Sequence, residues 1–146
     1  MTVLQMHNVG IVIENLPHAI AFFEALGLKV EGQVPVGGKW VDQVVGLDGV
    51  QCDIVMMCTP DGHSRIELTK FQSPKAIAYE PQNAPANAIG IRRIMFAVDN
   101  IDETVARLQK LGGEVFREIV KYEDAYRLCY VRGPEGLIVA IAQPLS

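Results

Sequence analysis

The chain has 146 residues, of which 49% are hydrophobic, and a formal net charge of −4 at neutral pH. It contains no cluster of Lys and Arg, which argues against nucleic acid as a partner, because binding nucleic acid requires phosphates to be neutralised. No apolar run approaches the ~20 residues that span a bilayer, so no membrane partner is expected either.

Cysteine usage points to a reducing compartment. The chain has three cysteines, an odd number, and none of them belongs to a Cys-x-x-Cys pair. They are Cys52, Cys58 and Cys129. Neither a disulfide framework nor a zinc ribbon is therefore expected. The first six residues lack the basic and apolar regions of a signal peptide. We expect a cytoplasmic location, with the three thiols buried and inert.

The first half of the chain reads as strand, helix and three strands. Pro17 suits the first turn of the helix and Gly27 suits its end, while Leu16, Ile20 and Phe23 form its predicted buried stripe. A Gly-rich loop with the only Trp, Trp40, separates the second and third strands. The predicted ranges are a strand at 3–13, a helix at 17–26, a strand near 28–34, the loop at 35–40, and strands near 50–58 and 64–71.

The second half repeats this order after a linker. Residues 72–89 are rich in Pro and Asn and are predicted to join a first module at 1–71 to a second at 90–146. The second helix should bury Ile101, Val105, Leu108 and Leu111. Its predicted ranges are a strand at about 90–98, a helix at 102–111, and strands near 114–121, 125–132 and 137–143.

An internal repeat supports this division. Residues 8–16 read Asn-Val-Gly-Ile-Val-Ile-Glu-Asn-Leu and residues 93–101 read Arg-Ile-Met-Phe-Ala-Val-Asp-Asn-Ile. Each is followed by a helix that ends in Leu-Gly. The predicted fold is α+β, with two repeated βαβββ modules that form a cupped, mostly antiparallel sheet with helices on its outer face. A ligand would sit at the joint between the modules.

Alternation along the strands assigns side chains to faces. Val9, Ile11 and Ile13, like their repeats Ile94, Phe96 and Val98, should pack under the helices. The opposite faces carry small or polar residues suited to lining a cup. The four equivalent cup positions are Asn8, Glu67, Arg93 and Ala140.

The layout resembles the vicinal oxygen chelate superfamily, which includes glyoxalase I, methylmalonyl-CoA epimerase, extradiol dioxygenases and bleomycin-resistance proteins. The resemblance covers nearly all of the chain except the linker. It is carried by residues 8–16, Phe22-Phe-Glu-Ala-Leu-Gly-Leu28, Arg65-Ile-Glu-Leu68, Phe96-Ala-Val-Asp-Asn-Ile101 and Arg132-Gly-Pro-Glu-Gly-Leu-Ile-Val139. It implies the fold more specifically than the reaction, since members of one fold carry out many reactions.

The resemblance also implies where a metal would be held, at the four cup positions. Metal-dependent members place His or Gln and Glu there. Here Glu67 matches, whereas Asn8 is a weak ligand, Arg93 cannot ligate and Ala140 has no donor. We therefore predict no metal and no cofactor.

Histidine could alter this prediction at one place. His7 lies beside the ligand position, and a one-residue bulge would turn it into the cup. Strand parity without a bulge sends it to the helix side or the sheet edge. His18, on the helix, and His63, in a turn, are expected to be solvated.

Several polar and aromatic side chains are candidates for the cup. Glu67 and Arg93 would either form an ion pair that fixes how the halves dock, or bind a ligand, with Arg93 holding an anionic group and Glu67 acting as a base. Core or interface packing is the alternative for the aromatic residues. The predicted pocket residues are Asn8, Glu67, Arg93, Met95, Tyr126, Tyr130 and Trp40, with Glu67 as the catalytic candidate.

Three functions remain open. The first is metal-free binding of a small organic molecule, anionic if Arg93 holds it, similar to the bleomycin-resistance members. The second is a lyase or isomerase similar to glyoxalase I or the epimerase, in which Glu67 works with a rebuilt metal site or with Arg93. The third is an interaction role with a filled cup. A homodimer is expected in each case.

Overall fold

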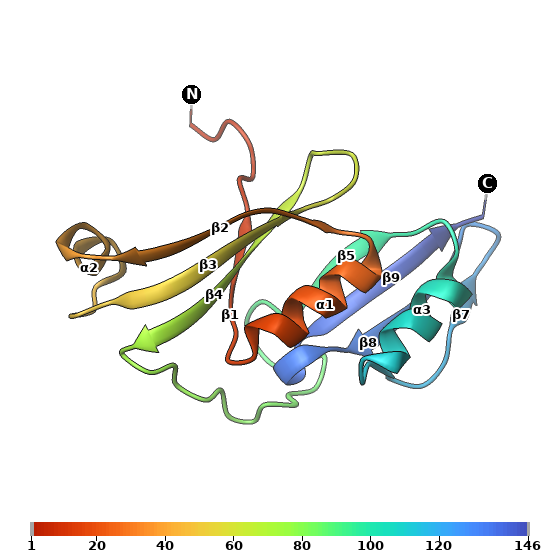
Figure 1. Cartoon of the computed structure of the whole chain (residues 1–146). Coiled ribbons are helices and arrows are strands. Elements are labelled where there is room, and N and C mark those ends of the chain that lie inside the picture. The colour runs from red at the N-terminus through yellow and green to blue at the C-terminus, as the bar shows by residue number, and fades with distance from the viewer. Residues whose placement is uncertain (1, 146) are drawn as a thin grey trace. The chain divides into compact units, whose positions relative to one another are not determined.

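The computed structural model describes residues 2–145, in two compact units (Figure 1). Unit 1 ends at Ile77 and unit 2 begins at Ala78, within the segment predicted as the linker. Each unit has its own sheet. Unit 1 contains β1 (Val9–Val12), α1 (Leu16–Leu26), β2 (Lys29–Gly37), α2 (Lys39–Val45), β3 (Gln51–Cys58) and β4 (Arg65–Ser73).

The sheet of unit 1 has the strand order β1-β4-β3-β2. β1 runs parallel to β4, and the other two pairings are antiparallel. α1 begins at the Asn15 cap, whose side chain accepts a hydrogen bond from the His18 backbone N–H, and it ends at Gly27 in the left-handed conformation. The helix contacts β2 and β4. The core includes Phe22 and Phe23 of α1 and Leu68 of β4, all fully buried.

The predicted Gly-rich loop at 35–40 is wrong, because β2 continues to Gly37 and α2 follows at Lys39. The side chain of Val41 is buried in a cluster with Val50 and Cys52, and this packing stabilises the short helix. The Asp42 carboxylate adds two hydrogen bonds, accepted from the backbone N–H groups of Gly49 and Val50. Trp40 therefore lies on a helix and not in a loop.

Unit 2 repeats the arrangement with a larger sheet. It contains β5 (Arg93–Ala97), α3 (Ile101–Lys110), β6 (Glu114–Val115), β7 (Val120–Tyr122), β8 (Tyr126–Arg132), a 3-10 turn η1 (Pro134–Gly136) and β9 (Ile138–Pro144). The strand order is β5-β9-β8-β6, and β7 also pairs with β8. β5 and β9 are parallel. The single strand predicted at 114–121 is two short strands.

Helix α3 covers one side of this sheet, in contact with β6, β8 and β9. Asn100 caps it by accepting a hydrogen bond from the Glu103 backbone N–H. The buried side carries Ile101, Val105 and Leu108, as the periodicity predicts, whereas Leu111, the fourth residue predicted to be buried, follows the helix and is partly exposed. In α1, by contrast, the predicted stripe is only partly right, since Phe23 is buried while Leu16 and Ile20 are partly exposed.

Each unit takes in residues that were predicted to belong to the linker. β4 continues to Ser73, two residues past the predicted end of the first module. Residues 78–89, predicted as linker, belong to unit 2. One Nη atom of Arg132 donates to the carbonyl oxygens of Ala84 and Gly136, at 2.9 and 3.1 Å, and so ties this segment to η1.

The α+β fold of two modules is confirmed, and residues 2–145 form three α-helices and mixed sheets of four and five strands. None of the helices in the described part of the chain has the length and apolar character needed to cross a membrane.

Candidate functional site

Unit 2 presents one sheet face away from α3, which we call open face 2. Val131 lies on the helix side, because its side chain lies close to Gly113 at the end of α3. Alternation then places Tyr130 and Arg132 on the opposite side. The strand register extends this face from β8 across β9 to β5. Tyr130 pairs with Ala140, which pairs with Met95, and Arg132 pairs with Ile138, which pairs with Arg93. Its strand residues are Arg93, Met95, Ala97, Glu114, Val120, Tyr122, Tyr126, Leu128, Tyr130, Arg132, Ile138, Ala140 and Ala142.

Aromatic rings and guanidinium groups alternate on open face 2. The guanidinium carbon of Arg93 lies over the Tyr130 ring, 5.3 Å from its centroid. Tyr130 meets Phe116 edge to face at 5.8 Å. Arg132 lies over Phe116 at 4.7 Å. Contacts of this kind attract a cation to the negative face of a ring.

The two guanidinium groups differ in what else they bind. Arg132 donates to two backbone carbonyls and is partly buried. Arg93 is exposed, and no carboxylate of unit 2 between residues 78 and 145 forms an ion pair with it. The Arg93 N–H groups are therefore available to an anion.

The other predicted residues of unit 2 lie on the same face. Met95 is 51% exposed and Tyr126 is 45% exposed, whereas Ala140 is fully buried. Sequence reasoning missed Phe116, which follows β6 and donates its backbone N–H to the Tyr130 carbonyl. Phe116 lies inside the strand predicted near 114–121, and an aromatic residue within that strand was its only sequence signal.

Unit 1 has a corresponding face, which we call open face 1. Register aligns Gly10, Glu67, Met56 and Gly32 across its four strands. Glu67 is partly buried, and its carboxylate accepts a 3.4 Å hydrogen bond from the Thr69 hydroxyl. Glu67 is thus a carboxylate without an ion pair among the described residues of unit 1.

Asn8 precedes β1, and its Nδ2 donates to the Nδ1 of His7 at 3.1 Å. The β1–β4 pairing has an unbroken register, so the bulge that would turn His7 toward the ligand position is absent from this pairing. His7 is exposed, while Asn8 is partly buried. Trp40, on α2, is 63% exposed.

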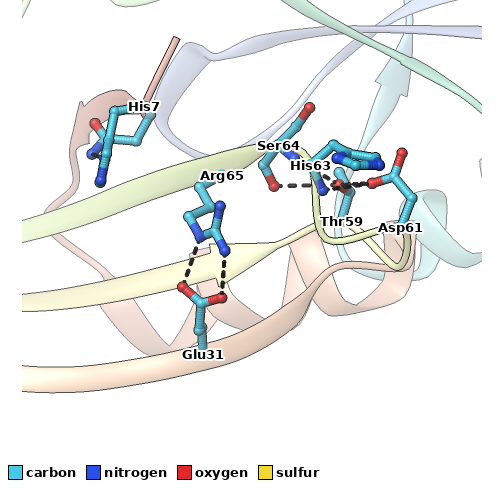
Figure 2. A network of polar contacts seen from close by, with 8 residues as sticks. His7, Glu31, Thr59, Asp61, His63, Ser64 and Arg65 are labelled. Atoms are coloured by element: carbon cyan, nitrogen blue, oxygen red, sulfur yellow. Dashed lines mark hydrogen bonds and ion pairs between the residues drawn. The ribbon is translucent and has the colours of Figure 1, made fainter. Parts of the chain in front are cut away.

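An ion pair that sequence reasoning missed lies at the His7 end of β4 (Figure 2). Arg65 donates two hydrogen bonds to the Glu31 carboxylate, at 2.8 and 3.1 Å. These bonds lower the pKa of Glu31. Glu31 is the extra residue at the register shift between β2 and β3, so alternation alone could not predict its direction.

The turn beside this pair contains His63 and is held by its own hydrogen bonds (Figure 2). The Thr59 hydroxyl donates to Asp61 at 2.6 Å, and the His63 backbone N–H donates to the same carboxylate at 3.0 Å. Both bonds lower the pKa of Asp61. The His63 side chain is exposed, which suits a turn-forming role.

The three cysteines are free thiols. Cys52 and Cys129 are buried as predicted, and burial raises the pKa of both thiols. Cys58 is only partly buried, so the prediction of three buried thiols is wrong for Cys58. The Asp53 carboxylate accepts a hydrogen bond from the Gln72 side chain, and Arg127 donates one to the Asp102 carboxylate. Asp53 and Arg127 therefore bind different residues.

Comparison with known proteins identifies the family. Residues 5–141 match the model of the Glyoxalase/Bleomycin resistance protein/Dioxygenase superfamily. The chain belongs to this superfamily. No curated protein matches it.

Solved structures of glyoxalase-superfamily proteins agree. A glyoxalase family protein from Bacillus cereus is 50% identical, with a TM-score of 0.95 over 100% of this chain and 97% of that one. A glyoxalase family protein from Enterococcus faecalis is 20% identical, with a TM-score of 0.64 over 97% and 99%. The trypanothione-dependent glyoxalase I of Leishmania major is 18% identical, with a TM-score of 0.67 over 97% and 87%. The last two show the fold alone.

Two of the four positions that the resemblance assigns to metal ligands, Arg93 and Ala140, carry side chains that cannot ligate. Open face 2 offers a guanidinium at Arg93 and a methyl group at Ala140, and neither has a lone pair to donate. Open face 1 offers the carboxylate of Glu67 and the weak amide of Asn8. Among residues 2–145, no group of three or more His, Cys, Asp or Glu side chains is arranged to hold a metal.

Proposed function

We propose that this glyoxalase-superfamily protein binds a small organic molecule with an anionic group, and that Arg93 on open face 2 holds that group. The main observation in support is that the Arg93 guanidinium is exposed, lies over the ring of Tyr130 and pairs with no carboxylate among the described residues of unit 2. A guanidinium matches a carboxylate by two parallel hydrogen bonds. The surrounding side chains of Met95, Tyr126 and Tyr130 offer apolar surface for the rest of the molecule.

The methionine methyl groups of the chain test this proposal. Met95 is on open face 2, while Met57 is fully buried in unit 1. A library of small organic acids, amines and neutral compounds is screened against protein with 13C-labelled methionine methyls. We expect several acids to shift the Met95 resonance and leave Met57 in place. If no compound shifts Met95, the proposal fails.

Enzyme activity is the second candidate function, and Glu67 on open face 1 favours it. A partly buried carboxylate whose bonded partner in unit 1 is a hydroxyl can accept a proton, as a general base requires. Lyase or isomerase chemistry would then use Glu67 as its general base. Turnover of an identified ligand that Glu67→Gln abolishes without loss of binding would support this role.

The proposal also includes the other predicted pocket residues, the predicted homodimer and the predicted cytoplasmic location. Asn8 and Trp40 stay predicted pocket residues. A homodimer in the cytoplasm stays the predicted state, supported by free cysteines and by large apolar side chains that are exposed on α2.

A further inference from the structure

We infer that the preferred ligand of open face 2 is an aromatic monocarboxylate, in which a planar ring bears the acid directly. This inference rests on the proposed function and narrows its ligand class. Its basis is the alternation of Arg93, Tyr130, Phe116 and Arg132 on one sheet face.

The charge on this face suits a single anionic group. Of its two cations, Arg132 is held by the carbonyl oxygens of Ala84 and Gly136. Arg93 is the exposed cation of the two, and no carboxylate among the described residues of unit 2 pairs with it. At the edge of the sheet, Glu114 is paired in register with Arg132 and adds negative charge there. One exposed guanidinium balances one negative charge, so a monoanion suits this face better than a dianion such as a phosphate ester.

The position of Arg93 favours a planar acid. Its guanidinium is held over the Tyr130 ring, so it is orientated before a ligand arrives and loses less side-chain entropy on binding. A bidentate guanidinium–carboxylate pair is planar. When the carboxylate is conjugated to a ring, that ring extends the same plane.

The apolar neighbours favour an aromatic ring over a saturated one. The aromatic ring of Tyr130 lies beside Arg93. In the strand register Tyr130 pairs with Ala140 and Ala140 pairs with Met95, whose side chain is 51% exposed. Aromatic rings gain from stacking with another ring and from contact with a thioether sulfur, beyond the burial of apolar area. Ala140, between these two residues, projects no more than a methyl group.

The test compares three matched probes by calorimetry and by the Met95 methyl resonance. 2-Naphthoate carries ring and charge, 2-naphthamide removes the charge, and decahydro-2-naphthoate removes the aromaticity. We expect 2-naphthoate to bind at least about tenfold more tightly than either of the others. Arg93→Met should reduce its affinity to that of the amide, while Tyr130→Leu should weaken it and Tyr130→Phe should retain it.

Arg127→Met is the matched control, because it removes the same charge from the α3 side of the sheet, where Arg127 pairs with Asp102. It should leave the affinity for 2-naphthoate unchanged. Binding of decahydro-2-naphthoate as tight as that of 2-naphthoate would overturn the aromatic-acid assignment while the proposed function stands. Full binding by Arg93→Met, or binding of 2-naphthamide as tight as that of 2-naphthoate, would overturn the proposed function as well, because Arg93 would then not hold an anionic group. If none of the three shifts Met95 but other library compounds do, the assignment is also overturned. If no compound shifts Met95, the proposed function falls with it.

Discussion

The guanidinium carbon of Arg93 lies 5.3 Å from the centroid of the Tyr130 ring, on the sheet face of unit 2 that α3 leaves uncovered. The two residues come from β5 and β8, with β9 between them. Their contact joins a cation to a row of rings that continues to Phe116. This relationship makes Tyr130 a positioning residue for Arg93 and a contributor to stability.

Replacement of Tyr130 should separate these contributions. Tyr130→Leu loses an edge-to-face ring pair and a cation–ring contact, so we expect the free energy of unfolding to fall by about 1–2 kcal/mol. Tyr130→Phe keeps both contacts and should lie within about 0.5 kcal/mol of the parent chain. Urea unfolding measures both variants. A double-mutant cycle with Phe116→Leu should give a coupling of about 0.5–1.5 kcal/mol; zero coupling would contradict the row of contacts.

Gly136 should tolerate no side chain. Its φ is +88°, and a Cβ there would fall on the carbonyl oxygen of Gln82. Gly136→Ala should therefore destabilise the protein by about 3 kcal/mol or more, measured by urea unfolding. Gly112→Ala is the control, because Gly112 has a φ of +90° but open space around it. It should cost only about 1 kcal/mol, and equal losses would show that the backbone contact with Gln82 is unimportant.

The Glu31–Arg65 pair should make stability depend on acid pH. Hydrogen bonds from Arg65 lower the pKa of Glu31 in the folded chain below its ordinary value of about 4.3. The pair's contribution is therefore fully present above pH ~4.3 and is lost as the pH falls through the folded pKa. Arg65→Gln should lower the urea midpoint at pH 6–7, and the difference from the parent should shrink below about pH 4.

Lys121→Gln is the control for that experiment, since Lys121 and Asp124 form an ion pair at 3.4 Å that is well exposed. Its effect should be smaller at every pH, because exposed pairs contribute little. A constant difference between Arg65→Gln and the parent from pH 3 to pH 7 would show that Glu31 does not carry the dependence.

Helix α2 provides the test of the predicted homodimer. Trp40 and Val44 lie one turn apart on it and are 63% and 74% exposed, so they form an apolar surface. We expect the parent chain to sediment as a dimer and Val44→Asp to sediment as a monomer with unchanged circular dichroism. Gln43→Asp adds the same charge to the same helix beside that surface and should stay dimeric. A monomeric parent would refute the prediction.

Metal content is the remaining prediction. We expect the purified protein, before and after incubation with Ni²⁺, Zn²⁺, Mn²⁺ or Fe²⁺, to hold far less than one ion per chain by plasma mass spectrometry. The reason is that Arg93 and Ala140 stand where ligands would be needed. An ion near one equivalent that Glu67→Gln removes, while Asp53→Asn does not, would mean that the chain builds a metal site from other residues.

The sequence by itself determined the repeat, the fold class and the two faces of each sheet. Alternation is a local property with a period of two, so it correctly predicted that Leu68 of β4 is buried while its neighbour Glu67, on the opposite face, is only partly buried. It left the face of Tyr130 open. Helix α3 is apolar on one side only, so its buried residues could also be predicted from the sequence. In α1, which is apolar on most sides, periodicity marked Leu16 and Ile20 as buried, and they are partly exposed.

The tertiary structure decided which side chains meet. Arg65 reaches Glu31 across two strand pairings and a register shift, and Arg132 reaches Ala84, 48 residues away. Such contacts depend on the register between strands and on where a bulge falls, and neither is written in the local pattern. The same holds for α2, a short helix that depends on burying Val41 against residues further along the chain.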